Sequence, residues 1–345
     1  MEQKKRFAYL DALRIIAIMC VIFNHSGVNG YFLYTTTNRL PVQLISIFIS
    51  SFCKIGVLLF FMISGALLLK KEESLKELYL KRVLRYLIIL FVFSLIRYSY
   101  LAYHGQITFD WKDLIRKITT GQIYTPYWFL YSYLGFLISL PILRKIAKAL
   151  NPNEFLYLFG LYVLAGGIFG VLARTFLGQI VIAIPFAADV IVYPLMGYFI
   201  AYCIPSEKDN CKTLLLTCLC AFLGLCLNVF ITEYDYHVFG GWSEGGLSLF
   251  VIFSATAVFY GVKYFFEHVP ISAFLEKIIC SVGECTFGVY LLECYVKDYF
   301  GFIQKLLAAI IPARLAAILY LFCIMLIGTA ITYILKKIPF IRKLL

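Results

Sequence analysis

The feature that most constrains this chain is a series of apolar stretches, each long enough to cross a bilayer, that follow one another along the whole sequence. About 20 apolar residues in a helix span the roughly 30 Å hydrocarbon core of a membrane. The expected spans are residues 7–25, 41–69, 83–103, 124–147, 155–173, 179–203, 213–232, 246–266, 278–297 and 307–335. The sequence therefore predicts an all-α, polytopic transmembrane bundle of about ten helices.

The composition excludes a water-soluble protein. Of the 345 residues, 62% are hydrophobic and only 14% are charged, whereas soluble domains carry about 25% charged residues. The net charge of +12 does not indicate nucleic-acid binding, because the basic residues lie between apolar stretches, where they act as topology signals. We therefore expect a membrane protein that binds no nucleic acid.

The positions of the basic residues predict the orientation of the chain. Lys and Arg are concentrated at the N-terminus, at the C-terminus and in alternate connecting segments, which places both termini in the cytoplasm by the positive-inside rule. Asp11 and Arg14 interrupt the first apolar run, so we expect a retained helix rather than a signal peptide. Residues 1–345 are expected to form a single membrane domain with no soluble domain.

Metal binding is not expected. The eleven cysteines form no C-x-x-C pair, and most lie inside apolar stretches. Cysteines in such surroundings are typical of small core side chains rather than of a disulfide or metal framework.

The first predicted helix carries the strongest functional pattern. Asp11, Arg14 and His25 lie on a helix otherwise made mainly of apolar residues. Arg14 and His25 are separated by about 16 Å along the axis and fall on nearly the same face, at 1.5 Å and 100° per residue. Ionisable groups at membrane depth are costly and usually face an internal cavity, and histidine can exchange a proton near neutral pH. We predict a transmembrane polar stripe with a functional His25.

A structural interpretation of these residues remains open. Asp11 and Arg14 are also suited to an interfacial ion pair that sets the depth of the helix, with His25 as a cap at the outer surface. For Asp11 alone the two interpretations are evenly matched, whereas Arg14 and His25 together favour function.

The pattern resembles a known family. An Asp, an Arg three residues later, and a His after ten further residues are similar to the first-helix signature of the membrane acyltransferases called acyltransferase family 3. Phe60, Phe61, Ser64 and Gly65 are similar to that family's F-F-x-x-S-G segment, and GECTFGVYL at 283–291 is similar to its G-x-x-S/T-F-G-x-Y-L pattern. The matches follow the family's order over nearly the whole chain. Ser64 and Gly65 themselves suit close helix packing in lipid.

Two arginines begin the third predicted helix. Arg82 and Arg85 lie one turn apart in the sequence KRVLR, and guanidinium groups suit bidentate binding of phosphate. The resemblance implies that this R-x-x-R binds the phosphates of an acyl-coenzyme A. From charge alone, a positive-inside anchor explains the pair equally well.

Three further residues are candidates for a substrate pocket. Trp128 and Tyr131 open a stretch similar to the family's W-F-L segment, although an aromatic belt is the simpler interpretation. Glu293 stands where many relatives have a His. If 278–297 were one helix, Glu284 and Glu293 would lie on opposite sides of it, and the deeper Glu293 would be the one that holds a charge partner.

The resemblance implies an integral membrane O-acyltransferase of the bacterial plasma membrane. An acyl group, most plausibly acetyl, would pass from cytoplasmic acyl-CoA to a hydroxyl of a cell-surface or lipid-linked carbohydrate, with or without a partner protein that takes up the acyl group or assembles the glycan. His25 would act as general base or transient acyl carrier. Arg14 would neutralise negative charge, and Asp11 would fix Arg14.

Two other classes of function compete with this interpretation. In a proton-coupled transporter, Asp11, Arg14, His25, Lys54 and Asp189 would line a polar path, but the halves of the chain show no inverted repeat. In a membrane scaffold or sensor, replacing His25 would matter no more than replacing a lipid-facing neighbour.

Overall fold

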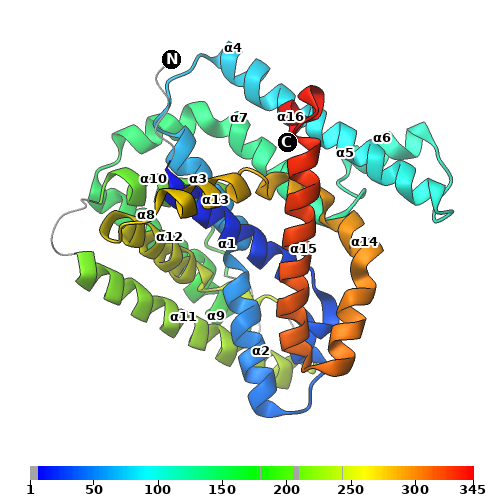
Figure 1. The fold of residues 1–345 in the computed structure, drawn as a ribbon. Coiled ribbons are helices and arrows are strands. Elements are labelled where there is room, and N and C mark those ends of the chain that lie inside the picture. Colours follow the sequence, from blue (N-terminus) through cyan, green and yellow to red (C-terminus); the bar gives the residue numbers. More distant parts are fainter. Residues whose placement is uncertain (1–6, 177, 179, 205–209, 243) are drawn as a thin grey trace. The chain divides into compact units, whose positions relative to one another are not determined.

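The computed structural model describes residues 7–176, 178, 180–204, 210–242 and 244–345, and every regular element in these ranges is a helix (Figure 1). This confirms the predicted all-α fold class. The contacts within the chain divide it into two compact units. The first comprises residues up to 66 with 151–343 and 345, and the second comprises 67–150 with 344.

The first unit contains most of the long helices, with 3₁₀ and π segments between some of them. They are α1 (Ala8–Asn24), η1 (Gly27–Asn29), η2 (Tyr31–Thr35), α2 (Leu40–Cys53), most of α3 (Ile55–Leu68), α8 (Pro152–Tyr162), η5 (Val163–Ile168), α9 (Phe169–Thr175), α10 (Asp189–Tyr202), α11 (Asn210–Phe239), η6 (Gly246–Ser248), α12 (Val251–His268), α13 (Ala273–Gly283), α14 (Thr286–Ile310), α15 (Ala313–Leu335) and most of α16 (Pro339–Leu344).

The second unit is smaller and begins in the last turn of α3. It contains α4 (Leu75–Leu78), the π-helical segment η3 (Tyr79–Val83), α5 (Leu84–Tyr103), α6 (Trp111–Thr119), η4 (Thr125–Tyr127) and α7 (Trp128–Ala149). Ser74 and Glu77 form a capping box at the start of α4, which fixes where the chain turns into this helix.

Six helical segments in the described part of the chain are long and apolar enough to span a membrane, or seven if one bent pair counts as a span. The protein is thus an integral membrane protein. The predicted count of about ten is not reached by this criterion. Neither α1, with 17 residues, nor α5, which carries Arg85 and Arg97, is among the six.

Two predicted spans differ from the structure in a way that matters. The stretch 179–203 becomes helical only at Asp189, and α10 has 14 residues, which is about 21 Å of helix. The stretch 278–297 is not one helix, because α13 and α14 meet at an angle of 55° after Gly283. The second difference changes the interpretation of Glu293.

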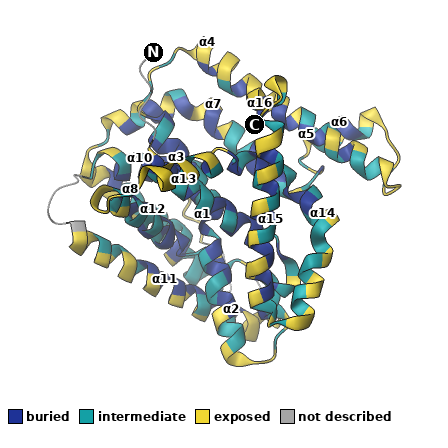
Figure 2. Cartoon of the chain, viewed as in Figure 1, coloured by how far each residue is buried: buried dark blue, intermediate teal, exposed yellow. Residues whose placement is uncertain are grey.

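The helices present apolar side chains outward, as lipid requires. On α11 the exposed large apolar residues are Leu215, Leu216, Leu219, Phe222, Leu223, Leu227 and Phe230, and Figure 2 shows exposed positions along this helix. A soluble protein would not leave such a face bare. Surface of this kind is stable only against acyl chains.

Small residues allow two helices of the first unit to approach closely. A side chain at Gly65 on α3 would overlap the carbonyl of Pro194 on α10, and one at Gly197 on α10 would overlap the carbonyl of Met62. These reciprocal contacts are the packing role that the sequence predicts for Gly65.

The helix α1 is central to the first unit. It contacts α2, α12, α13, α14 and α15, and its residues Leu13, Ala17 and Ile18 are fully buried. Polar groups on the buried face of this helix, such as Asp11, face protein rather than lipid. This arrangement positions the two ends of α1, where the ionisable residues lie.

Candidate functional site at the two ends of α1

His25 lies at the C-terminal end of α1, directly after Asn24. Its Nδ1 is 2.5 Å from Oε1 of Glu293 on α14. The Glu293 side chain is fully buried, whereas 23% of the His25 side chain is exposed. A carboxylate only accepts hydrogen bonds, so Nδ1 carries the proton and donates it to Glu293. Nε2 then keeps its lone pair and is the nitrogen able to take a proton from a substrate.

A lysine completes this group. Lys297 lies one turn after Glu293 on α14, with its Nζ 3.7 Å from Oε1 of Glu293. The same Nζ donates to the backbone carbonyl of His25 at 3.3 Å. The cation thus compensates the buried carboxylate and also lies at the negative end of the α1 dipole. Lys297 was not singled out from the sequence, although its i+4 spacing from Glu293 was a usable signal.

Hydrogen bonds fix the chain just after His25. The Ser26 hydroxyl donates to the carbonyl of Phe23 at 2.6 Å and accepts from the backbone N–H of Tyr31 at 2.9 Å. Gln304 on α14 donates to the carbonyl of Ser26 at 3.0 Å. The imidazole therefore projects from a backbone that is tied both to its own turn and to α14.

Asp11 and Arg14 form an ion pair at the other end of α1. Asp11 is buried with 1% exposed, and it packs against Gly283 at the end of α13, where an added Cβ would lie 2.6 Å from the Asp11 Cβ. The Thr286 hydroxyl donates to the Gly283 carbonyl at 2.9 Å. Gly283 and Thr286, two residues of the motif at 283–291, thus shape the surroundings of Asp11.

The predicted stripe therefore consists of two separate groups. Arg14 and His25 are eleven residues apart on one helix, or about 16 Å, and each has its own partners. The prediction of a hydrated path that joins them is not tested.

The prediction that Glu284 and Glu293 face opposite sides of one helix is wrong, because the chain bends by 55° between them. Glu284 is half exposed and pairs with Lys336 at 3.3 Å. Glu284 lies at the bend between α13 and α14, whereas Glu293 lies inside α14. The different exposure of the two carboxylates therefore comes from the bend and not from the helical period. Both carboxylates have a charge partner, and Glu293 is the one whose side chain is fully buried.

Two arginines of the second unit share one carboxylate, and a third has a different partner. Arg82 binds both carboxylate oxygens of Glu73, with Nε 2.7 Å from Oε1 and Nη2 3.0 Å from Oε2. Arg144 on α7 approaches the same carboxylate, with Nη2 3.4 Å from Oε2. Arg85 instead donates to the carbonyl of Leu344 at 3.3 Å. The predicted phosphate-binding role of Arg82 and Arg85 stays a prediction.

The predicted aromatic pocket residues also lie in the second unit. Trp128 at the start of α7 is 50% exposed. The Tyr131 hydroxyl donates to the carbonyl of Ile118 on α6 at 2.5 Å. Their predicted part in a substrate pocket is not tested.

The two residues that a transporter path would add have local partners in the first unit. Lys54 pairs with Glu244 at 2.6 Å, and the Tyr31 hydroxyl donates to the same carboxylate at 3.1 Å. Asp189 accepts a hydrogen bond from the Tyr162 hydroxyl at 2.5 Å. Neither contact extends the polar groups of α1.

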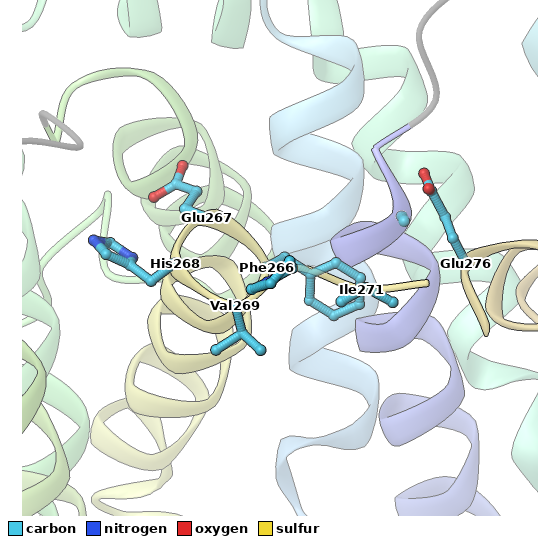
Figure 3. A pocket seen from close by; sticks show the side chains of 8 residues that line it. Phe266, Glu267, His268, Val269, Ile271 and Glu276 are labelled. Atoms are coloured by element: carbon cyan, nitrogen blue, oxygen red, sulfur yellow. The ribbon is translucent and has the colours of Figure 1, made fainter. Parts of the chain in front are cut away.

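A hollow of about 390 Å³ lies at the Asp11 end of the first unit, formed by Ala8, residues 266–271 and Glu276 (Figure 3). Figure 3 shows Phe266, Val269 and Ile271 near its middle, with the Glu267 and Glu276 carboxylates on either side. Its two carboxylates disfavour a polyanionic ligand. None of the predicted site residues lines it.

The comparisons with known proteins agree with the order of the motifs. A family model described as an acyltransferase domain matches residues 7–337. The match includes both ends of α1, the Glu73 region and the motif at 283–291. No curated protein matches the chain, and no solved structure does.

Proposed function

The chain belongs to acyltransferase family 3, and from that premise we propose that this membrane acyltransferase moves an acetyl group from acetyl-CoA to a hydroxyl of a cell-surface or lipid-linked carbohydrate. The bacterial plasma membrane is its proposed location. The observation that carries the proposal is the His25–Glu293 pair, in which a buried carboxylate holds Nδ1 and leaves Nε2 as a base.

The reaction uses His25 as the proton carrier. Nε2 takes the proton from the acceptor hydroxyl while the oxygen attacks the thioester carbonyl carbon, which forms a tetrahedral intermediate. The C–S bond then breaks, and the coenzyme A sulfur leaves with the proton that His25 returns. The Glu293 carboxylate stabilises the imidazolium that exists between these two steps.

Glu293 and Lys297 act through His25. Glu293 fixes the ring and its tautomer. Lys297 compensates the carboxylate and ties the His25 carbonyl to α14, so that the trio is neutral overall before His25 takes a proton.

Arg14 and Asp11 have a supporting role in the proposal. The side chain of Arg14 is 28% exposed, and the buried Asp11 orients it. A positive charge held in this way suits an anionic part of the donor as it enters the first unit. Because it lies about 16 Å from His25 along α1, we assign Arg14 to binding the donor rather than to stabilising the reacting carbonyl.

The test is replacement of His25 by Ala in cells that produce the protein. We expect O-acetyl groups to disappear from the surface glycans in mass spectra, with membrane expression unchanged. His268→Ala is the matched control, because His268 only stacks on Tyr264 and bonds to its backbone carbonyl. Undiminished acetylation in the His25→Ala cells would end the proposal.

A further inference from the structure

The second unit contains a carboxylate held between two guanidinium groups. Glu73 accepts two hydrogen bonds from the Nε and Nη2 atoms of Arg82, at 2.7 and 3.0 Å, and lies 3.4 Å from Nη2 of Arg144. Only 12% of the Glu73 side chain is exposed. A carboxylate and a phosphate offer the same pair of oxygens to the guanidinium fork. The site is thus already shaped for an anion.

Arg144 is the residue that distinguishes this group from an ordinary surface ion pair. It is buried, with 8% exposed, and its Nε donates to the Leu68 carbonyl at 3.0 Å, which fixes the direction of the side chain. Its Nη2 is buried and makes no hydrogen bond within the described part of the chain. A buried guanidinium nitrogen without a hydrogen bond is costly. It indicates an anionic ligand with one more oxygen than the Glu73 carboxylate offers to Nη2 of Arg144.

The neighbouring charges have other partners. Glu72 pairs with Lys148 at 2.6 Å and Glu77 with Lys81 at 2.9 Å, on side chains that are about half exposed or more. Arg85 bonds to the Leu344 carbonyl. The two arginines that converge on one anion are therefore Arg82 and Arg144, which are 62 positions apart, rather than the adjacent Arg82 and Arg85 of the R-x-x-R sequence.

Glu73 is able to leave. It belongs to the segment between α3 and α4 that has no helical structure, just before the cap residue Ser74. A rotation of this segment releases the carboxylate to water without unwinding a helix. The two arginines stay in place, since one is on η3 and the other on α7.

We infer that Arg82 and Arg144 form a binding site for a phosphate group of the acyl-CoA donor, and that Glu73 is an internal anion which the phosphate displaces. This inference rests on the proposed donor. A phosphate carries more negative charge than the carboxylate and has a further oxygen for Nη2 of Arg144, so the exchange favours the donor once it is present. In the absence of donor, Glu73 prevents the buried Arg144 guanidinium and the partly exposed Arg82 guanidinium from facing each other without a counter-ion.

The experiment measures the binding of coenzyme A to the purified full-length protein in lipid nanodiscs. Glu73→Gln removes the competing charge, so we expect the dissociation constant to fall about 3- to 10-fold, since apparent affinity scales with the fraction of protein in the competent state. Arg144→Met is expected to weaken binding about 10-fold or more, the typical cost of losing one charge-assisted contact. Lys81→Met is the matched control for loss of one nearby positive charge, with an expected change below about twofold.

Four further measurements keep the result interpretable. Thermal unfolding of each variant shows whether it is folded, and Arg144→Lys, which keeps the charge without the planar fork, is expected to recover only part of the affinity. Arg85→Met is expected to weaken binding less than Arg144→Met. His25→Ala is included because binding of the donor does not depend on the base.

The possible results distinguish failure of the arginine site from failure of the proposed coenzyme A donor. If the wild-type protein binds coenzyme A but Glu73→Gln does not tighten binding, and Arg144→Met behaves like Lys81→Met, the arginine site is overturned while the donor assignment stands. If the wild-type protein does not bind coenzyme A, the donor assignment fails and this inference fails with it.

Discussion

Each unit contains a buried carboxylate shared by two basic side chains, and the two groups differ in one respect. In the first unit Glu293 lies between His25 and Lys297. In the second unit Glu73 lies between Arg82 and Arg144. Histidine releases its proton near neutral pH, whereas arginine does not. The same arrangement of charges therefore yields a proton carrier in one unit and an anion site in the other.

Glu293→Gln is expected to have the largest effect, because it removes the carboxylate shared by His25 and Lys297. The amide keeps the size of the side chain but cannot enforce Nδ1 protonation or stabilise the imidazolium, so we expect the turnover number to fall by about 100-fold or more, the usual scale of general base catalysis. Acetyl transfer by purified protein measures it. Glu284→Gln is the matched control, because Glu284 pairs with Lys336 at the surface. Equal losses in both variants would show that Glu293 has no special role.

Lys297→Met tests the second basic side chain that contacts Glu293 in the first unit. Without the cation, the buried Glu293 carboxylate keeps only His25 as a partner for its charge, so turnover at neutral pH is expected to fall about 10-fold. Lys297→Arg keeps the charge and is expected to restore most of the turnover. A loss that arginine does not repair would mean that Lys297 only anchors the end of α1 through the His25 carbonyl.

Gly283→Ala separates structure from chemistry at the Asp11 end of α1. The added Cβ would lie 2.6 Å from the Asp11 Cβ, and overpacking of this kind costs about 1–3 kcal/mol. We expect a lower unfolding temperature in detergent and a weaker donor affinity, with the pH dependence of turnover unchanged. Gly301→Ala is the matched control, because a Cβ there meets nothing within 4 Å. A shifted pH profile in Gly283→Ala would instead couple the two ends of α1.

The smallest expected effect concerns the stability of the second unit. The hydrogen bond from Arg82 lowers the pKa of Glu73 from its ordinary value of 4.5. A carboxyl with a lowered folded-state pKa contributes stability above its ordinary pKa, and this contribution is lost as the pH falls through the folded-state pKa. The difference in unfolding temperature between wild type and Glu73→Gln is therefore expected at pH 7 and expected to shrink below about pH 4. A difference in unfolding temperature that does not change with pH would contradict the assignment.

The fold was predictable because lipid imposes a simple rule. Apolar stretches of sufficient length must become helices in a bilayer, and most expected spans lie on long helices. The non-helical backbone before Asp189 and the bend after Gly283 were missed, since apolar residues alone do not reveal where a helix stops inside an apolar stretch. The bend is local geometry that hydropathy does not encode.

The site was predictable where an ionisable residue interrupts an apolar helix. Arg14, His25 and Glu293 stand out for that reason. Glu73 and Arg144 did not, because each lies in a segment already rich in charge, where the positive-inside rule explains a basic residue without any contact. Their significance depends on tertiary contacts, as does the pairing of His25 with a residue 268 positions away.

The most direct test of the account is to measure coenzyme A binding and a single turnover of acetyl transfer side by side in His25→Ala. We expect the variant to bind coenzyme A within about twofold of wild type, because the proposal assigns the donor phosphates to arginines and not to His25, and to transfer no acetyl group. Transfer at the wild-type rate would contradict the role of His25 as the base. Loss of both binding and transfer in a folded variant would contradict the assignment of proton transfer to the His25–Glu293 pair and of donor binding to the arginines around Glu73.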